Sequence, residues 1–157
     1  MAINDTKDLN KFLKPFPAPI IKTVNWLREF VWKLYPETNE LLYDNYNAVA
    51  IGWSITDRVS HVFCNIAIGR TSHNIHFGFY WGVELSDPDK KLIGEGNQYR
   101  YILVANTNDF PKLYMKKLMK EAYTNSLKKI KDKNEIIHGK TITKSISAKK
   151  RVIKKKK

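Results

Sequence analysis

The sequence predicts an α+β domain, an α-β-α sandwich with about five strands in one antiparallel sheet, followed by a basic C-terminal tail. Three observations support this fold class. An apolar stripe with helical spacing lies on each side of a central block of short extended segments. The links within that block are short, which suits antiparallel pairing, because parallel strands need long crossover connections. Helices and strands are therefore segregated along the chain, as in α+β folds.

The first predicted helix follows an N-terminal arm of residues 1–14, which is either a short helical arm or a loose start. Three prolines between residues 15 and 19 interrupt any helix, since proline fixes φ and disfavours helical geometry just before it. Pro19 suits the first turn of the next helix. Its apolar stripe is Ile20, Val24, Leu27, Val31 and Leu34, and Pro36 ends it.

Five strands are expected in the middle of the chain, at residues 41–46, 48–53, 62–68, 75–81 and 99–104. In the fourth, Ile75, Phe77 and Phe79 share one face by the two-residue period. The long irregular stretch from 82 to 98 contains turn residues and the pair Gly94 and Gly96. A tight turn explains these glycines better than a phosphate loop, because a strand follows them instead of a helix.

A second helix is predicted to start near Thr107–Pro111, where a polar cap precedes a proline. Its apolar stripe is Met115, Leu118, Met119 and Ala122. The stripe fades through Leu127 and Ile130, so we place the folded domain at residues 15–125. Residues 126–157 are expected to form a disordered basic tail.

The net charge of +13 belongs almost wholly to this tail. Residues 126–157 hold 13 of the 28 Lys and Arg residues but only two of the 15 acidic residues. Dense runs of cations attract phosphate backbones without sequence specificity. The candidate nucleic-acid contacts are Lys149, Lys150, Arg151, Lys154, Lys155 and Lys156. No recognition motif accompanies them, so a solvated tail that adds solubility is the alternative.

Composition narrows the class of protein. Hydrophobic residues make up 43% of the chain and aromatic residues 12%, enough to build a core. No apolar run approaches the roughly 18 residues that a membrane helix needs. The N-terminus carries Asp5 and has no apolar segment typical of a signal peptide. Cys64 is the only cysteine, and together these features predict a cytoplasmic protein.

Several motifs between residues 17 and 122 resemble the YdhG-like family, a bacterial domain of unknown function. They are Pro17–Ile20, Tyr43–Ala48, Ala50–Gly52, His73–Gly82, Leu85–Pro88, Leu92–Gly96 and Arg100–Ile102. The chain departs from many members at Tyr46-Asn47-Ala48, where they have Gly-Met-Pro, and at Tyr101, where they have histidine. The resemblance implies a frataxin-like arrangement with an antiparallel sheet.

Some relatives of this family are described as frataxin-like intracellular iron chaperones, which makes iron a candidate cargo. Frataxin-type binding relies on an acidic ridge. Here the first predicted helix has Glu29 as its only acid among three cations, and Glu37, Glu40 and Asp44 form a small acidic cluster beyond it. These charges suit a hard cation poorly, so iron carriage is an alternative function.

No catalytic or metal-binding constellation stands out in the sequence. His73 and His76 are three residues apart, which in a strand places them on opposite faces. His61 has no partner at a zinc-ligand spacing. Cys64 lies in an apolar strand, where cysteine is usually a small buried hydrophobe. We therefore predict a non-enzymatic protein without a metal.

Aromatic residues at the strand ends are the remaining candidates for a ligand site. Tyr and Trp often line grooves, and their polar atoms need partners when buried. Arg100 could clamp an anion or a carboxylate. The predicted pocket lies between Trp53, Trp81 and Arg100, with Tyr46 and Tyr101 beside it; packing on the sheet is the alternative. The leading hypothesis is a binding or accessory domain for a small ligand or protein partner.

Overall fold

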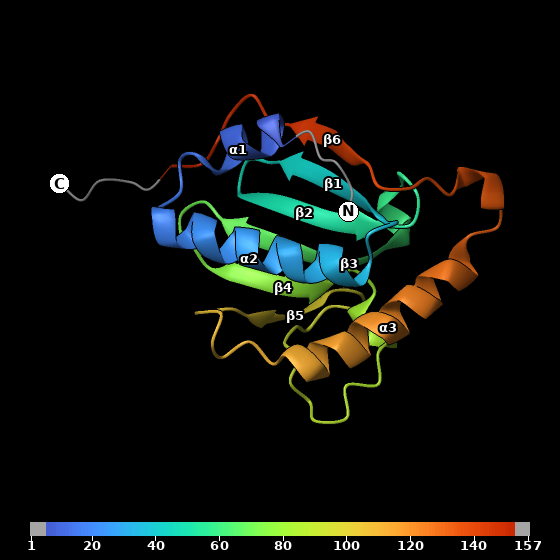
Figure 1. Cartoon of the computed structure of the whole chain (residues 1–157). Coiled ribbons are helices and arrows are strands. Elements are labelled where there is room, and N and C mark those ends of the chain that lie inside the picture. Colours follow the sequence, from blue (N-terminus) through green and yellow to red (C-terminus); the bar gives the residue numbers. More distant parts are fainter. Residues whose placement is uncertain (1–5, 153–157) are drawn as a thin grey trace.

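A computed structural model describes residues 6–152 (Figure 1). Its helices are α1 (Lys7–Leu13), α2 (Ala18–Leu34) and α3 (Lys112–Lys129). Its strands are β1 (Asn39–Asp44), β2 (Ala48–Ser54), β3 (Val62–Gly69), β4 (Ile75–Phe79), β5 (Arg100–Leu103) and β6 (Thr141–Ile146). Short 3-10 turns lie at η1 (Val59–His61), η2 (Gly82–Glu84) and η3 (Lys133–Glu135).

The predicted α+β class is confirmed, with all six strands in one sheet. The strand order is β5-β4-β3-β2-β1-β6. Neighbouring strands are antiparallel except for β1 and β6, which pair in parallel. Short connections join β1 to β2 and β3 to β4, whereas β6 reaches β1 only after α3. Within residues 6–152, no helix has both the length and the apolar character needed to cross a membrane.

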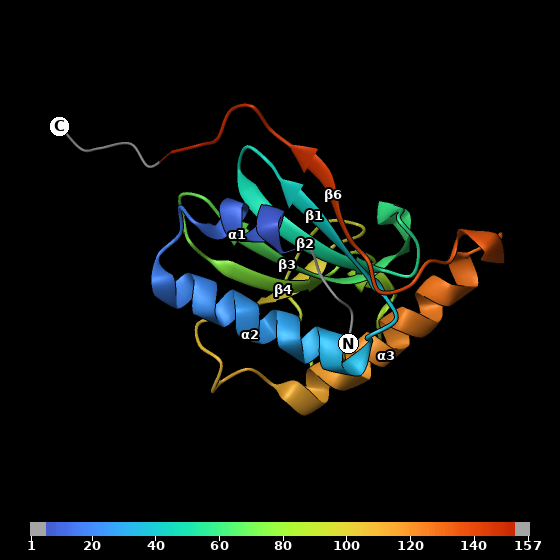
Figure 2. The same cartoon turned by 45° about the horizontal axis from the view of Figure 1, so that its top comes forward.

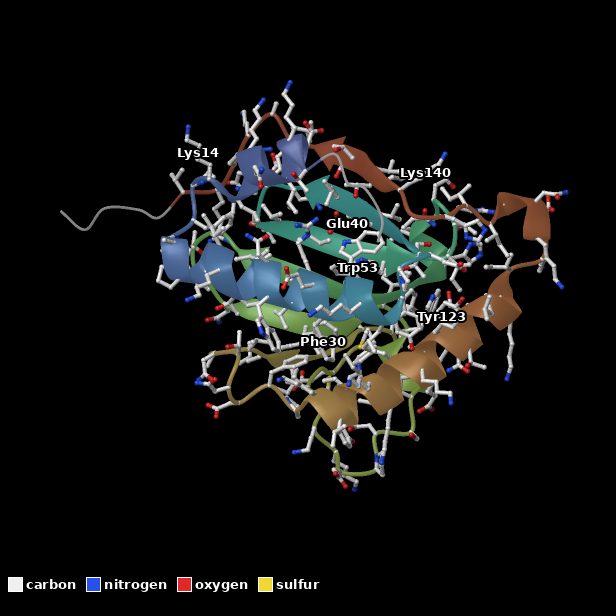
Figure 3. The ribbon with its side chains drawn as sticks, viewed as in Figure 1. Lys14, Phe30, Glu40, Trp53, Tyr123 and Lys140 are labelled. Carbon is white, nitrogen blue, oxygen red and sulfur yellow. The ribbon has the colours of Figure 1, made fainter. Side chains whose placement is uncertain are left out.

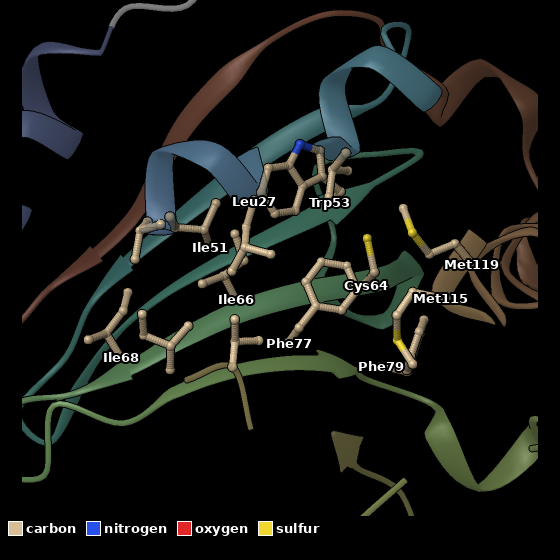
Figure 4. Close-up of a cluster of buried hydrophobic side chains, with 14 of the residues drawn as sticks. Leu27, Ile51, Trp53, Cys64, Ile66, Ile68, Phe77, Phe79, Met115 and Met119 are labelled. Carbon is tan, nitrogen blue, oxygen red and sulfur yellow. The ribbon is translucent and has the colours of Figure 1, made fainter. Parts of the chain in front are cut away.

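Helices α2 and α3 both pack against the same face of the sheet (Figures 1 and 2). Alternate residues of β2, β3 and β4 point at them and form the buried core (Figure 4). Trp53 in β2 is fully buried and meets Trp32 of α2 edge to face, with ring centroids 6.2 Å apart. Met115 and Met119 of α3 close the other end of this core. Burial of these apolar surfaces is what holds the helices on the sheet.

The opposite face of the sheet, which we call the open face, is covered by no α-helix of the described chain (Figures 1 and 2). Side chains alternate between faces along a strand. Cross-strand pairing therefore gives the open face its residues: Leu41, Tyr43, Ala50, Gly52, Asn65, Ala67, His76, Gly78, Tyr101 and Leu103. Most of the open-face residues in the central strands have small side chains, which project only a short distance above the sheet.

The expectation of a disordered tail from residue 126 is wrong for most of that segment. Helix α3 continues to Lys129, and residues 141–146 form β6 on the outer edge of β1. The Asn39 side chain fixes the approach, since its amide donates to the Ile137 carbonyl at 2.8 Å and accepts from the Lys140 amide at 3.1 Å. Pairing with β6 satisfies backbone groups that an edge strand leaves unpaired.

A buried ion pair ties β1 to α2. Arg28 of α2 donates through Nε and Nη2 to the two Glu40 carboxylate oxygens, at 2.6 and 2.9 Å. Glu40 is fully buried between sheet and helix, near Trp53 (Figure 3). Thr141 of β6 donates a further hydrogen bond to the same carboxylate at 3.1 Å. The carboxylate is therefore satisfied from both neighbouring elements.

Removing the arginine should be costly. Arg28→Met leaves the Glu40 charge buried without its partner, and we expect the free energy of unfolding to fall by about 3–5 kcal/mol. Urea denaturation measures this change. The matched control is Arg58→Met, because Arg58 pairs with Glu135 at 3.4 Å on the surface and should lose less than about 1 kcal/mol. Equal losses in the two variants would contradict the role assigned to Arg28.

Candidate ligand site on the open face of the sheet

On the open face, residues that are paired across neighbouring strands form rows that run across the sheet. One row runs through Gly52, Asn65, Gly78 and Tyr101, each directly opposite the next. The two glycines of this row make room for side chains of the chain itself, since Val62 lies over Gly52 and Tyr99 lies over Gly78. A Cβ atom added to Gly78 would lie 2.3 Å from Tyr99 Oη and 2.6 Å from its ring. The ring of Tyr99 therefore lies directly over Gly78, in space that any larger residue would fill.

Three rings gather at this place, and we call His76, Tyr99 and Tyr101 the ring stack. His76 and Tyr101 are parallel within 1°, with centroids 3.9 Å apart. Tyr99 and Tyr101 lie 5.5 Å apart at an angle of 19°. The Asn65 amide donates to Tyr99 Oη at 3.2 Å, which holds the outer ring in position. Aromatic pairs of this kind add stability beyond the area that they bury.

An open depression of about 620 Å³ borders the ring stack. Its lining is the segment 93–99 together with Tyr101, and we call it the loop depression. Ile93 and Tyr101 exchange backbone hydrogen bonds of 2.7 and 3.0 Å, which fold the segment back onto β5. Gly94 makes this turn at a φ of +141°, a conformation that favours glycine. The side chains of Asn97 and Gln98 line the depression and make no hydrogen bond within residues 6–152.

Two members of the ring stack, Tyr99 and His76, are uncharged at neutral pH. Burial raises the pKa of Tyr99 to about 12, and Tyr101 adds to the effect while the Asn65 hydrogen bond opposes it. Burial lowers the pKa of His76 below its ordinary value, so the imidazole is neutral at pH 7. Glu95 is the only carboxylate that lines the loop depression. The site therefore favours a neutral ring over an anion.

Two polar atoms on the open face are buried and make no hydrogen bond in the described chain. They are Tyr43 Oη and Asn65 Oδ1. Burial, followed by the nearby Tyr80, raises the pKa of Tyr43, so its hydroxyl stays protonated and can donate. An unpaired buried group costs free energy that a partner would recover. Both atoms are covered by other atoms of the protein, so neither is presented directly to a ligand at the surface.

The pocket predicted between Trp53, Trp81 and Arg100 does not form. Trp53 lies on the helix face and is fully buried in the core. Trp81 Nε1 donates to the Ser60 carbonyl at 2.8 Å, and Lys129 Nζ lies 5.0 Å from the centre of the Trp81 ring. Arg100 Nη1 donates to the Tyr99 carbonyl at 2.7 Å.

Of the predicted ligand residues, only Tyr101 lies in the site. Tyr46 is 47% exposed in the turn between β1 and β2, away from the ring stack in the sheet. Sequence reasoning missed His76 as a ring partner, and it missed Asn97 and Gln98. The spacing of Tyr99 and Tyr101 places both on one side of an extended segment. Only the pairing of β4 with β5 reveals that His76 joins them.

Two of the three acids nominated for iron are already paired with cations, whereas the third, Glu37, is exposed and makes no ion pair within residues 6–152. Glu40 binds Arg28, as described above, and Asp44 binds both Arg70 and Lys150. Among residues 6–152, no cluster of three or more His, Cys, Asp or Glu side chains could hold a metal ion. Cys64 is fully buried, and burial raises the pKa of its thiol well above the usual value. These residues give no observation in favour of iron carriage.

The candidate nucleic-acid contacts fall into two groups. Lys149 is exposed, Lys150 lies against Asp44 at 2.9 Å, and the Arg151 amide donates to the Tyr46 carbonyl at 2.9 Å. Lys154, Lys155 and Lys156 lie outside the described residues. Part of the cationic segment is thus docked on the turn between β1 and β2.

Comparisons of the chain with models of protein families, with curated proteins and with solved structures found no match.

Gly78 provides a direct test of the ring stack. Gly78→Ala places a methyl group in the space of the Tyr99 ring, and we expect it to displace the ring and to lower stability by about 1–3 kcal/mol. The near-ultraviolet circular dichroism of the tyrosines should change with it. Gly96→Ala is the matched control, since a Cβ there meets nothing within 4 Å. An unchanged spectrum for Gly78→Ala would contradict the geometry of the stack.

Proposed function

We propose that this chain is a non-catalytic binding domain that holds a planar, uncharged heterocycle of the nucleobase kind on the open face of its sheet. The observation that carries the proposal is the ring stack of His76, Tyr99 and Tyr101, which borders a depression of about 620 Å³. A planar ring in the loop depression would meet the tyrosine rings and extend their stacking. Base–aromatic stacking contributes about 1–3 kcal/mol per base.

The polar lining of the loop depression supports a hydrogen-bonding heterocycle over a plain hydrocarbon ring. Asn97 and Gln98 each carry an amide with donors and an acceptor, and their side chains are unengaged within the described chain. The edges of nucleobases present the complementary donors and acceptors. Ligand sites commonly combine an apolar or aromatic lining with a few polar groups of this kind.

Charge supports the base over the phosphate of a nucleotide as the group that is held here. His76 is neutral at pH 7, Tyr99 is protonated, and Glu95 adds a negative charge to the lining. A phosphate in the loop depression would face this carboxylate with no lining cation to offset it. The depression therefore suits the uncharged end of a ligand.

We also propose that residues 17–122 are related to YdhG-like domains. The motif from His73 to Gly82 and the spacing of Gly94 and Gly96 before Arg100 support the relationship, and the α+β class agrees with what the resemblance implies. We further propose a cytoplasmic location. The single cysteine is a buried thiol, which suits a reducing compartment.

Calorimetric titration with adenosine, guanosine, cytidine and uridine tests the proposal. We expect saturable binding of at least one nucleoside. Tyr101→Ala should weaken it by about tenfold or more, because the stacking contribution is lost. Tyr46→Ala is the matched control, since Tyr46 is an exposed tyrosine in the turn between β1 and β2.

Two results would contradict the assignment. The first is a failure of every nucleoside to bind at millimolar concentration. The second is an equal loss of affinity in Tyr101→Ala and Tyr46→Ala, which would show that the ring stack has no special part in binding.

A further inference from the structure

A second cavity, of about 410 Å³, lies where the C-terminal segment returns to the sheet. Phe16 comes from the link between α1 and α2, Arg70 and His73 from the turn between β3 and β4, and Lys150 and Arg151 from the C-terminal segment. These residues line what we call the cationic cavity. Five side chains from three distant parts of the chain thus converge on one space.

The C-terminal segment is docked by backbone hydrogen bonds. The Ser147 amide donates to the Asp44 carbonyl at 2.7 Å, and the Arg151 amide donates to the Tyr46 carbonyl at 2.9 Å. The ammonium of Lys150 donates to the Asp44 carbonyl at 3.1 Å and approaches its carboxylate at 2.9 Å. These contacts hold Lys150 and Arg151 in the lining of the cavity.

Arg70 is the best-placed donor in the cationic cavity. Its side chain is only 6% exposed. Nε donates to the Asn45 carbonyl at 2.9 Å, and Nη2 donates to the Asp44 carboxylate. Nη1 makes no hydrogen bond to any residue from 6 to 152, although Arg70 lines the cavity. A buried guanidinium therefore retains unused donors, and guanidinium groups match phosphate oxygens in geometry.

The charge of the cavity is positive even after its internal ion pairs are counted. Arg70, Lys150 and Arg151 are cations, and the only carboxylate that pairs with them is Asp44. Arg151 Nη1 reaches Asn47 Oδ1 at 3.4 Å, which leaves most of its donors available. The rings of His73 and Phe16 meet edge to face, with their centroids 5.8 Å apart. The ring nitrogens of His73 make no hydrogen bond within the described chain.

From this geometry we infer that the cationic cavity is a binding site for a phosphate group, held by the Arg70 and Arg151 guanidinium groups with His73 beside them. The inference rests on different residues from the ring stack and stands apart from the proposed base site. The apolar ring of Phe16 forms one wall, so the phosphate can belong either to inorganic phosphate or to an organic monoester.

Calorimetric titration of the full chain with inorganic phosphate and with phenyl phosphate, at constant ionic strength, is the experiment. We expect saturable binding that Arg151→Gln weakens by about tenfold or more, as for the loss of charge-assisted hydrogen bonds. Lys149→Gln is the matched control, because it removes the same charge from an exposed side chain that does not line the cavity. His73→Gln should weaken binding without unfolding the protein.

Tighter binding of phenyl phosphate would identify an organic monoester as the source, and equal affinities would identify free phosphate. Absence of binding at millimolar phosphate would overturn the inference. So would an equal loss in Arg151→Gln and Lys149→Gln, because binding would then follow overall charge. Tyr101→Ala should leave phosphate binding unchanged, so this site and the proposed base site fail or succeed separately.

Discussion

The structure depends on the way that β2, β3 and β4 divide their side chains between the two faces of the sheet. Large apolar residues such as Trp53, Ile66 and Phe77 point at the helices and are fully buried. Their neighbours on the open face include Gly52 and Gly78. The same alternation thus builds the core on one side. On the other side it places glycines, and an aromatic ring, that of Tyr99, can lie directly over Gly78.

Strand β1 joins the core to the rest of the chain through two buried acids. Glu40 binds Arg28 of α2, and Asp44 binds Arg70 and Lys150. Each carboxylate is held by cations from other elements of the chain, so its burial is compensated only when those elements are docked on β1. β6 and the C-terminal segment therefore complete the environment of β1, and the cationic cavity follows from their docking.

The spacing of apolar residues along the sequence predicted those helices and strands in which that spacing is regular. The stripes of α2 and α3 and the five central strands are of this kind. β6 was missed because its partner is about 100 residues away, as the contact between Glu40 and Thr141 shows, and because lysines dilute its pattern. Trp53 was assigned to a ligand site for a related reason, since alternation cannot say which face the helices cover. The pairing of His76 with Tyr101 likewise depends on register between strands.

The location of charge in the fold changes what the net charge of +13 means. Lys150 is engaged by Asp44 and two carbonyls, and Arg70 is fixed by Asp44 and Asn45. Cations that are held in this way cannot slide along a phosphate backbone, but they can define a site of fixed geometry. The loop depression, by contrast, contains no cation. Non-specific attraction by many mobile cations differs from binding by hydrogen-bond donors that are held in fixed positions. The docked part of the C-terminal segment has donors held in fixed positions.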